Sequence, residues 1–168
     1  MDAATLTIEI ATTGDFAAVD ALLARSYPIL LKPHYPPSVM VLAVPLIARA
    51  NPRLLSCGTY FVARSGGEIV GAGGWTPSAP VGASARPLVA HVRHVVTDHR
   101  LTRRGIGRAL VGHVVATAAA AGLTRLEAQA TRTAVPFYRA LGFEELEPVE
   151  VPLRPGIVFP AVSMARAL

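Results

Sequence analysis

The chain has 168 residues, of which 52% are hydrophobic and 16% are charged, and its net charge is +5. This length suits one domain with a real core, so a single domain over residues 1–168 is expected. The apolar fraction excludes disorder for the bulk of the chain. A single cysteine, Cys57, excludes an internal disulfide and a cysteine-based zinc finger. We find neither a secretory signal nor a membrane span, which favours a cytoplasmic protein.

The N-terminal third predicts a strand followed by two helices. Alternating residues indicate a strand over residues 6–11. Apolar residues at helical spacing then predict a helix that starts near Phe16 and ends before Pro28. Residues 38–50 are strongly apolar and predict a second helix, interrupted or kinked at Pro45.

The centre of the chain predicts three strands. Residues 60–64 and 68–75 flank a Ser-Gly-Gly turn and are typical of a hairpin. A loop rich in proline, glycine and serine leads to a valine-rich strand over residues 88–97.

The C-terminal half predicts two helices and three strands. A helix is expected over residues 105–121, a short strand over 126–130, a short helix over 133–141, and strands over 143–151 and 157–164. A strand–helix–strand unit between hairpins predicts an α/β fold, with a single mixed β-sheet flanked by helices on both faces.

The most informative segment runs from Val95 to Leu110, where a valine-rich strand leads through a basic turn into Gly105-Ile106-Gly107. The first turn of a helix leaves backbone N–H groups unpaired, and glycines let a phosphate approach them closely. Flanking arginines can add charge-assisted contacts. The only lysine, Lys32, follows no glycine-rich loop, which excludes a P-loop of the GxxxxGK type.

Three motifs give the chain a resemblance to the GNAT family of N-acetyltransferases. The segment LTRRGIGRAL is similar to the acetyl-coenzyme A loop of that family, (Q/R)-x-x-G-x-(G/A). AVPFYRALGF is similar to its A-x-x-F-Y-x-x-L-G-F helix and strand start, and GGEIVGAGGW is similar to its central hairpin. The chain departs from the family at Thr102, where glutamine or arginine is usual, and at Thr131, where asparagine is common.

The resemblance implies a GNAT-like fold and a site for acetyl-coenzyme A (acetyl-CoA), with no metal. In the family, backbone groups of one strand pair with the pantetheine arm, while amides at the start of the following helix hold the pyrophosphate. The cofactor-binding residues so implied are Val95, Val96, Thr97, Arg103, Arg104, Gly105, Ile106, Gly107, Arg108, Ala109, Thr131 and Tyr138.

The resemblance also implies direct transfer of acetyl to an amine, with two catalytic side chains. Tyr138 occupies the position of the family's general acid, which protonates the departing thiolate. His91 stands where histone-acetylating members carry a glutamate, and a histidine accepts a proton at neutral pH. An ordinary buried histidine is the alternative for His91, and a core tyrosine is the alternative for Tyr138. His94, three residues beyond His91, is expected on the opposite face of the strand.

Four aromatic residues are candidates for the acceptor groove: Tyr27, His34, Tyr35 and Trp75. Packing on the core explains them equally well. The last strands and the apolar segment 38–50 offer a face for a homodimer.

Two other functions remain open at this stage. The first is a non-catalytic acyl-CoA-binding or regulatory module on the same fold, because a fold does not fix its chemistry. The second is a nucleic-acid-binding domain that uses the arginine cluster. We rank it last and expect no nucleic-acid partner, because the sequence has no basic recognition helix or aromatic platform.

Overall fold

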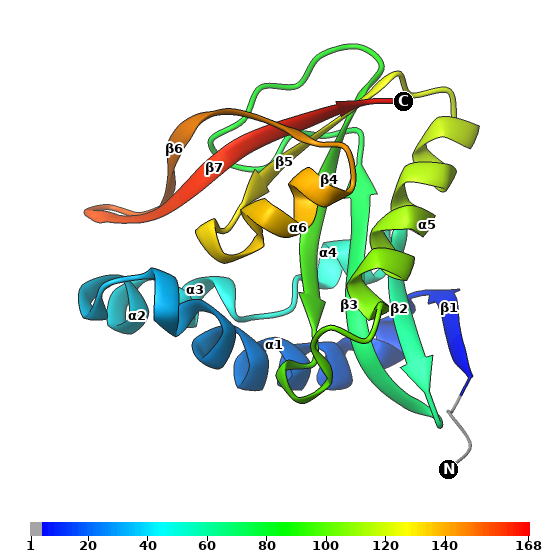
Figure 1. Cartoon of the computed structure of the whole chain (residues 1–168), viewed down its shortest axis with the longest axis horizontal. Helices are drawn as coiled ribbons and strands as arrows, with labels where there is room; N and C mark the ends of the chain where they lie inside the picture. The colour runs from blue at the N-terminus through cyan, green and yellow to red at the C-terminus, as the bar shows by residue number, and fades with distance from the viewer. Residues whose placement is uncertain (1–4) are drawn as a thin grey trace.

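The computed structural model describes residues 5–168, and its seven strands form one sheet in the order β1-β2-β3-β4-β5-β7-β6 (Figure 1). Only β4 and β5 run parallel; every other neighbouring pair is antiparallel. The predicted mixed sheet is therefore confirmed. The strands are β1 (Leu6–Ile10), β2 (Tyr60–Ser65), β3 (Glu68–Thr76), β4 (Val89–Thr97), β5 (Arg125–Ala130), β6 (Glu144–Arg154) and β7 (Ile157–Ala167).

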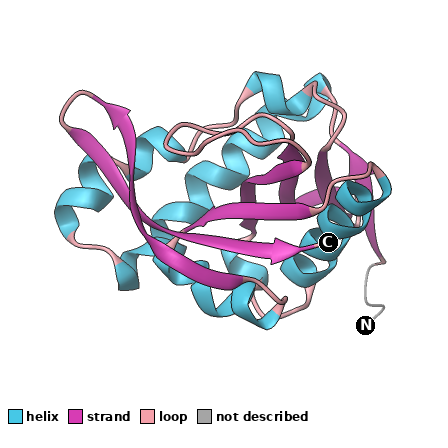
Figure 2. Ribbon diagram, turned by 90° about the horizontal axis from the view of Figure 1, so that it is seen from above, coloured by secondary structure: helices cyan, strands magenta, loops and turns pink. Residues whose placement is uncertain are grey.

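Helices cover both faces of this sheet, as the sequence predicts (Figure 2). Each face has its own apolar core: Leu22, Leu23 and Val62 belong to one cluster, whereas Leu110 and Leu126 belong to the other. No helix in residues 5–168 has the length and apolar character needed to cross a membrane. One face carries α1 (Phe16–Leu31), α2 (Pro37–Leu42), α3 (Val44–Ile47) and α4 (Pro52–Leu55), and the other carries α5 (Ile106–Ala120) and α6 (Val135–Ala140).

Helix α1 is longer than predicted, because it continues through Pro28 to Leu31. A proline inside a helix removes one backbone hydrogen bond, to the carbonyl four residues earlier. That carbonyl belongs to Ala24, and both Ala24 and Pro28 are exposed, so water can satisfy it. Burial of Leu31 on the core holds the extra turn in place.

The helix expected over residues 38–50 is interrupted, as one of the two predicted forms required, but the break lies at Ala43 and not at Pro45. The segment forms two short helices that meet at Ala43, with Pro45 in the first turn of α3. A further short helix, α4, was not predicted; the Asn51 side chain caps it by accepting a hydrogen bond from the Arg53 N–H at 3.0 Å.

Strands β4 and β5 pair over a short length only. Val89, Ala90 and His91 lie opposite Arg125, Leu126 and Glu127, and no pairing follows beyond that point. The C-terminal part of β4 therefore has a free edge, which faces the gap between the two strands.

A β-bulge interrupts β4 next to this gap. The register runs from Arg93 opposite Gly74 to Val96 opposite Ala72, so that His94 and Val95 share one partner, Gly73. The bulge overturns the expectation that His91 and His94 lie on opposite faces. The His94 ring lies beside the backbone of Ile47 in α3, and burial lowers its pKa to about 4.

Candidate active site

The glycine loop opens α5 as the sequence predicts. Gly105 is the N-cap residue and has a left-handed backbone, with φ of 80°. Gly107 lets α6 pack closely on the first turn of α5, because a Cβ at residue 107 would lie 3.2 Å from the Phe137 ring in α6. The first-turn amides of α5 have no helical partners and are available to an anion.

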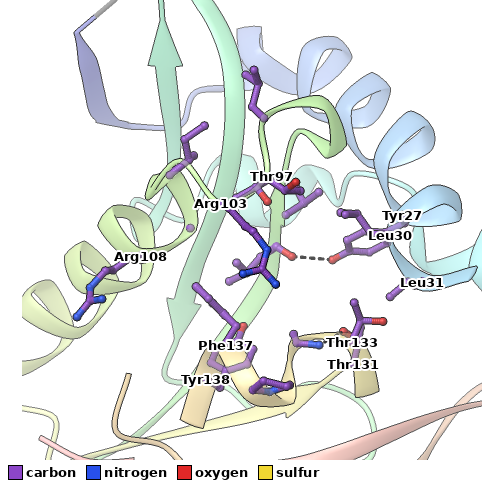
Figure 3. A pocket seen from close by; sticks show the side chains of 18 of the residues that line it. Tyr27, Leu30, Leu31, Thr97, Arg103, Arg108, Thr131, Thr133, Phe137 and Tyr138 are labelled. Atoms are coloured by element: carbon purple, nitrogen blue, oxygen red, sulfur yellow. Dashed lines mark hydrogen bonds between the residues drawn. The ribbon is translucent and has the colours of Figure 1, made fainter. Parts of the chain in front are cut away.

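A cavity of about 820 Å³ lies between this helix start, β4, α1 and α6 (Figure 3). Most of the predicted cofactor-binding residues line it. Arg104 and Ala109 do not, and both are exposed on the outer surface. The lining set contains Val95, Val96, Thr97, Arg103, Gly105, Ile106, Gly107, Arg108, Thr131 and Tyr138.

The cavity is positively charged at one end and apolar at the other. Arg103 and Arg108 line it near the start of α5, whereas Leu30 and Leu31 line it from α1. Among the described residues, no carboxylate lines its wall. This arrangement suits a long ligand with an anionic head and a less polar arm.

Arg103 adopts a backbone conformation that is unfavourable for a side chain, with φ of 61°. A non-glycine residue in the left-handed region costs on the order of 1 kcal/mol. Figure 3 shows its guanidinium reaching into the cavity between Thr97 and Tyr138. Such strain is common at ligand-binding sites.

Tyr138 lies in α6 with its ring held by two aromatic neighbours. The ring centroids of Phe137 and Phe143 each lie 5.2 Å away, in edge-on geometry. The side chain is buried but lines the cavity, and burial raises the pKa of its phenol above the ordinary value. The phenol is therefore a hydrogen-bond donor at neutral pH.

His91 is not brought together with Tyr138. It lines a second, smaller cavity of about 230 Å³, beneath the loop between β3 and β4. The His91 ring is buried, its Nε2 atom has no hydrogen-bond partner among the described residues, and burial lowers its pKa below 6.5. Arg86 and Glu127 form an ion pair in the same cavity. His91 is thus a neutral, unpartnered base at the point where β4 and β5 separate.

The four aromatic candidates for the acceptor groove divide into two pairs. Tyr27 and His34 line the large cavity. Tyr35 and Trp75 do not line either cavity. The Tyr35 hydroxyl is buried and donates to the Pro160 carbonyl at 2.8 Å. Trp75 points toward α5, where its Nε1 donates to Thr117 Oγ1 at 2.9 Å, because β3 directs that side chain to the other face.

Several lining residues were missed by the sequence analysis. Leu30 and Leu31 follow Pro28, where the predicted helix stopped, so the run of apolar residues beyond the proline was the missed signal. Leu101, Thr133 and Phe137 also line the cavity. The Phe137 ring also packs against Gly107.

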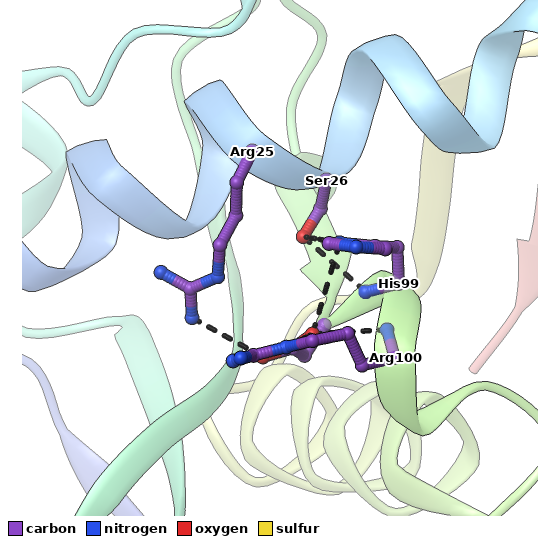
Figure 4. A network of polar contacts seen from close by, with 5 residues as sticks. Arg25, Ser26, His99 and Arg100 are labelled. Carbon is purple, nitrogen blue, oxygen red and sulfur yellow. Dashed lines mark hydrogen bonds and ion pairs between the residues drawn. The ribbon is translucent and has the colours of Figure 1, made fainter.

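A buried carboxylate ties α1 to the turn that precedes the glycine loop (Figure 4). Asp98 has 1% of its side chain exposed and accepts from Arg100 at 2.7 Å and Arg25 at 3.2 Å. The Ser26 hydroxyl accepts from the His99 N–H in the same place. The hydrogen bond from Arg100 is the main cause that holds the pKa of Asp98 well below its usual range.

Comparisons with known proteins agree with this geometry. A model of the acetyltransferase (GNAT) family matches residues 19–143. No curated protein matches the chain. A GCN5-related N-acetyltransferase structure from Rhodopseudomonas palustris is similar, with a TM-score of 0.79 and 17% identity over 100% of this chain and 99% of that one. The PaiA N-acetyltransferase from Thermoplasma acidophilum, solved in complex with coenzyme A, has a TM-score of 0.74 and 12% identity over 98% and 99% of the two chains. The ribosomal-protein-S18-alanine N-acetyltransferase from Escherichia coli has a TM-score of 0.63 and 17% identity over 97% and 94%.

We expect Asp98→Asn to lower the free energy of unfolding by about 2 kcal/mol at pH 7, the range for hydrogen bonds to a charged group. The folded state depresses the pKa of Asp98, so its contribution is present above about pH 4 and is lost as the pH falls further. Urea unfolding at pH 7 and pH 3 measures both effects. The gap between wild type and variant should shrink at pH 3. Glu144→Gln, at an exposed position, is the control and should change stability by less than about 0.5 kcal/mol. A pH-independent gap would contradict this assignment.

Proposed function

The chain belongs to the acetyltransferase (GNAT) family, and from that premise we propose that it transfers the acetyl group of acetyl-CoA to a primary amine, within one domain of residues 1–168. The observation that carries the proposal is the large cavity, which joins the unpaired amides of α5 to the Tyr138 side chain. Measuring thiol release from acetyl-CoA with a panel of amines tests it.

The cavity fits coenzyme A in three respects. The first-turn amides of α5, with Arg103 and Arg108, would hold the diphosphate. The free edge of β4 at Val95–Thr97 would pair with the amides of the pantetheine arm, as an added strand does. Thr131 lies where it would donate a hydrogen bond to the same arm.

The reaction needs a proton acceptor for the amine. An alkylammonium has a pKa near 10.4, so releasing its proton at pH 7 costs about 4.6 kcal/mol. His91 is neutral and lines the second cavity, and we assign it as the base, with water in that cavity carrying the proton to its imidazole. The second cavity beside His91 gives the amine an approach to the gap from the side of the β3–β4 loop.

The departing sulfur needs a donor, and Tyr138 supplies it. The amine nitrogen attacks the thioester carbonyl, the C–N bond forms, and the C–S bond breaks. One proton of the ammonium leaves through His91, and a second proton ends on the coenzyme A sulfur, donated through Tyr138. Burial raises the pKa of the phenol, so Tyr138 keeps its proton until negative charge builds on the sulfur beside it.

A non-catalytic acyl-CoA-binding module remains the second candidate, because such a module would bind acyl-CoA through the same residues as the enzyme. Tyr138, a proton donor that lines the same cavity as the start of α5, favours the enzyme. If acetyl-CoA binds and no amine is acetylated, the binding module is the better account.

Arg103→Gly should separate stability from binding. Glycine removes the strain of the left-handed backbone, so the free protein should gain about 1 kcal/mol of unfolding free energy. Loss of the guanidinium should raise the Kd for coenzyme A about tenfold. Thermal unfolding and calorimetry measure the two effects. Arg104→Ala, outside the cavity, should change the Kd by about twofold or less. An unchanged Kd in Arg103→Gly would remove this arginine from the site.

Tyr138→Phe should lower kcat by a factor of about 100 to 10,000, the range for loss of a positioned acid. The Kd for coenzyme A should stay within about twofold, because the aromatic packing of the ring is retained. Stopped-time assays of thiol release and calorimetry measure the two constants. Thr117→Val is the control, since it removes a half-buried hydroxyl near the far end of α5. Equal kcat in Tyr138→Phe and wild type would show that the phenol is only a core group.

His91→Gln should change the pH profile. With a base whose pKa lies below 6.5, wild-type kcat/KM for an alkylamine should level off above that pH. The variant should instead rise about tenfold per pH unit toward the pKa of the amine, near 10. His113→Gln, on α5 against Phe61, is the control and should keep the plateau. A plateau that survives in His91→Gln would mean that another group or water alone accepts the proton.

A further inference from the structure

The β-bulge in β4 holds a strained backbone beside the large cavity. His94 has φ of 45°, a conformation that L side chains rarely adopt. Its partner Gly73 leaves room for the bulge, because a Cβ at residue 73 would lie 2.8 Å from Val95 Cγ2. A strained backbone conformation of this kind persists only where several contacts with the surrounding structure hold it in place.

Two buried tyrosine hydroxyls supply that support. The Tyr60 hydroxyl donates to the His94 carbonyl at 2.8 Å. The Tyr27 hydroxyl donates to the Val95 carbonyl at 3.0 Å, the bond drawn as a dashed line beside Tyr27 in Figure 3. Tyr60 comes from β2 and Tyr27 from α1, so two separate elements hold consecutive peptides. Burial raises the pKa of both phenols, which therefore remain donors at any pH where the protein works.

A peptide group is planar and trans, so holding its carbonyl also fixes its N–H. The His94 carbonyl shares a peptide with the Val95 N–H, and the Val95 carbonyl shares one with the Val96 N–H. Val95 and Val96 both line the cavity beside Tyr138. Amides aimed in advance at developing negative charge lower a reaction barrier without reorganising.

We propose that Tyr60 and Tyr27 are positioning residues for acetyl transfer: their hydroxyls fix the two bulged peptides of β4, so that the Val95 and Val96 amides point at the thioester oxygen. This rests on the proposed function. Tyr60 does not line the cavity, so it acts on the reaction through the backbone alone. Tyr27 lines the cavity and holds the peptide nearer to the free edge of β4.

The alternative is that both tyrosines merely satisfy their own hydroxyls in the core. Tyr60→Phe separates the two accounts, because it removes one oxygen atom and keeps the ring. We expect kcat to fall about tenfold, less than the loss of a direct oxyanion donor. The Kd for coenzyme A should remain within about twofold of wild type.

A spectroscopic measurement gives the sharper readout. The infrared carbonyl stretch of acetyl-CoA labelled with ¹³C at the acetyl carbonyl, bound without any amine, reports hydrogen bonds to the thioester oxygen. In wild type this band should lie below that of free acetyl-CoA, and in Tyr60→Phe it should move back toward the free position. Tyr27→Phe should produce the same direction of shift, and it carries the test if Tyr60→Phe does not fold.

Thr117→Val is the matched control, because it also removes one half-buried hydroxyl that takes part in hydrogen bonds. It should lower the melting temperature and leave kcat and the infrared band unchanged.

If the tyrosine variants match Thr117→Val in kcat and in the band, the proposal is overturned. If wild type binds acetyl-CoA and acetylates no amine, the proposed function fails, and the infrared comparison alone decides whether the tyrosines aim the amides. If wild type does not bind acetyl-CoA, both proposals fail.

Discussion

The early separation of β4 from β5 is the constraint on which the rest of the site depends. The two strands pair only from Val89 to His91, and backbone groups of β4 beyond that point lose their neighbour. Unpaired backbone polar groups inside a protein are costly unless something else satisfies them. Tyr27 and Tyr60 satisfy two carbonyls from the side of α1. The free edge that remains is a template for a ligand with amides of its own, and a pantetheine arm has them.

The arginines around the site fall into two groups. Arg103 and Arg108 line the cavity and give it positive charge. Arg25 and Arg100 face Asp98 instead, which neutralises them and ties α1 to the turn before the glycine loop. Without that carboxylate, the guanidiniums of Arg25 and Arg100 would face each other with no counter-charge and would repel each other. The buried aspartate therefore lets the turn keep its shape while Arg103 and Arg108 concentrate positive charge at the cavity.

The sequence predicts the seven strands and the glycine loop well, because both depend on local chemistry. Gly105 and Gly107 mark the start of a helix, and alternating apolar residues mark the strands. The predictions that were wrong depend on distant contacts. Helix α1 passes Pro28 because Leu31 finds a core made by other segments, and the bulge at His94 exists because β3 offers Gly73 opposite it. No pattern along the chain shows either partner. Trp75 was expected near the acceptor groove, and only the pairing of β3 reveals that it faces α5.

The bulge also explains how one strand serves two cavities. Without it, strict alternation would place His91 and His94 on opposite faces of the sheet. The extra residue turns His94 back toward α3, and the following side chains exchange faces: Val95 packs with the α5 cluster, whereas Val96 packs with the α1 cluster. Upstream of the bulge, β4 presents His91 to the small polar cavity; downstream, it presents free backbone to the large one. A single inserted residue thus lets one strand line both cavities; in the proposed reaction, His91 would accept the proton at one end of the strand gap and the β4 amides would bind the thioester oxygen at the other.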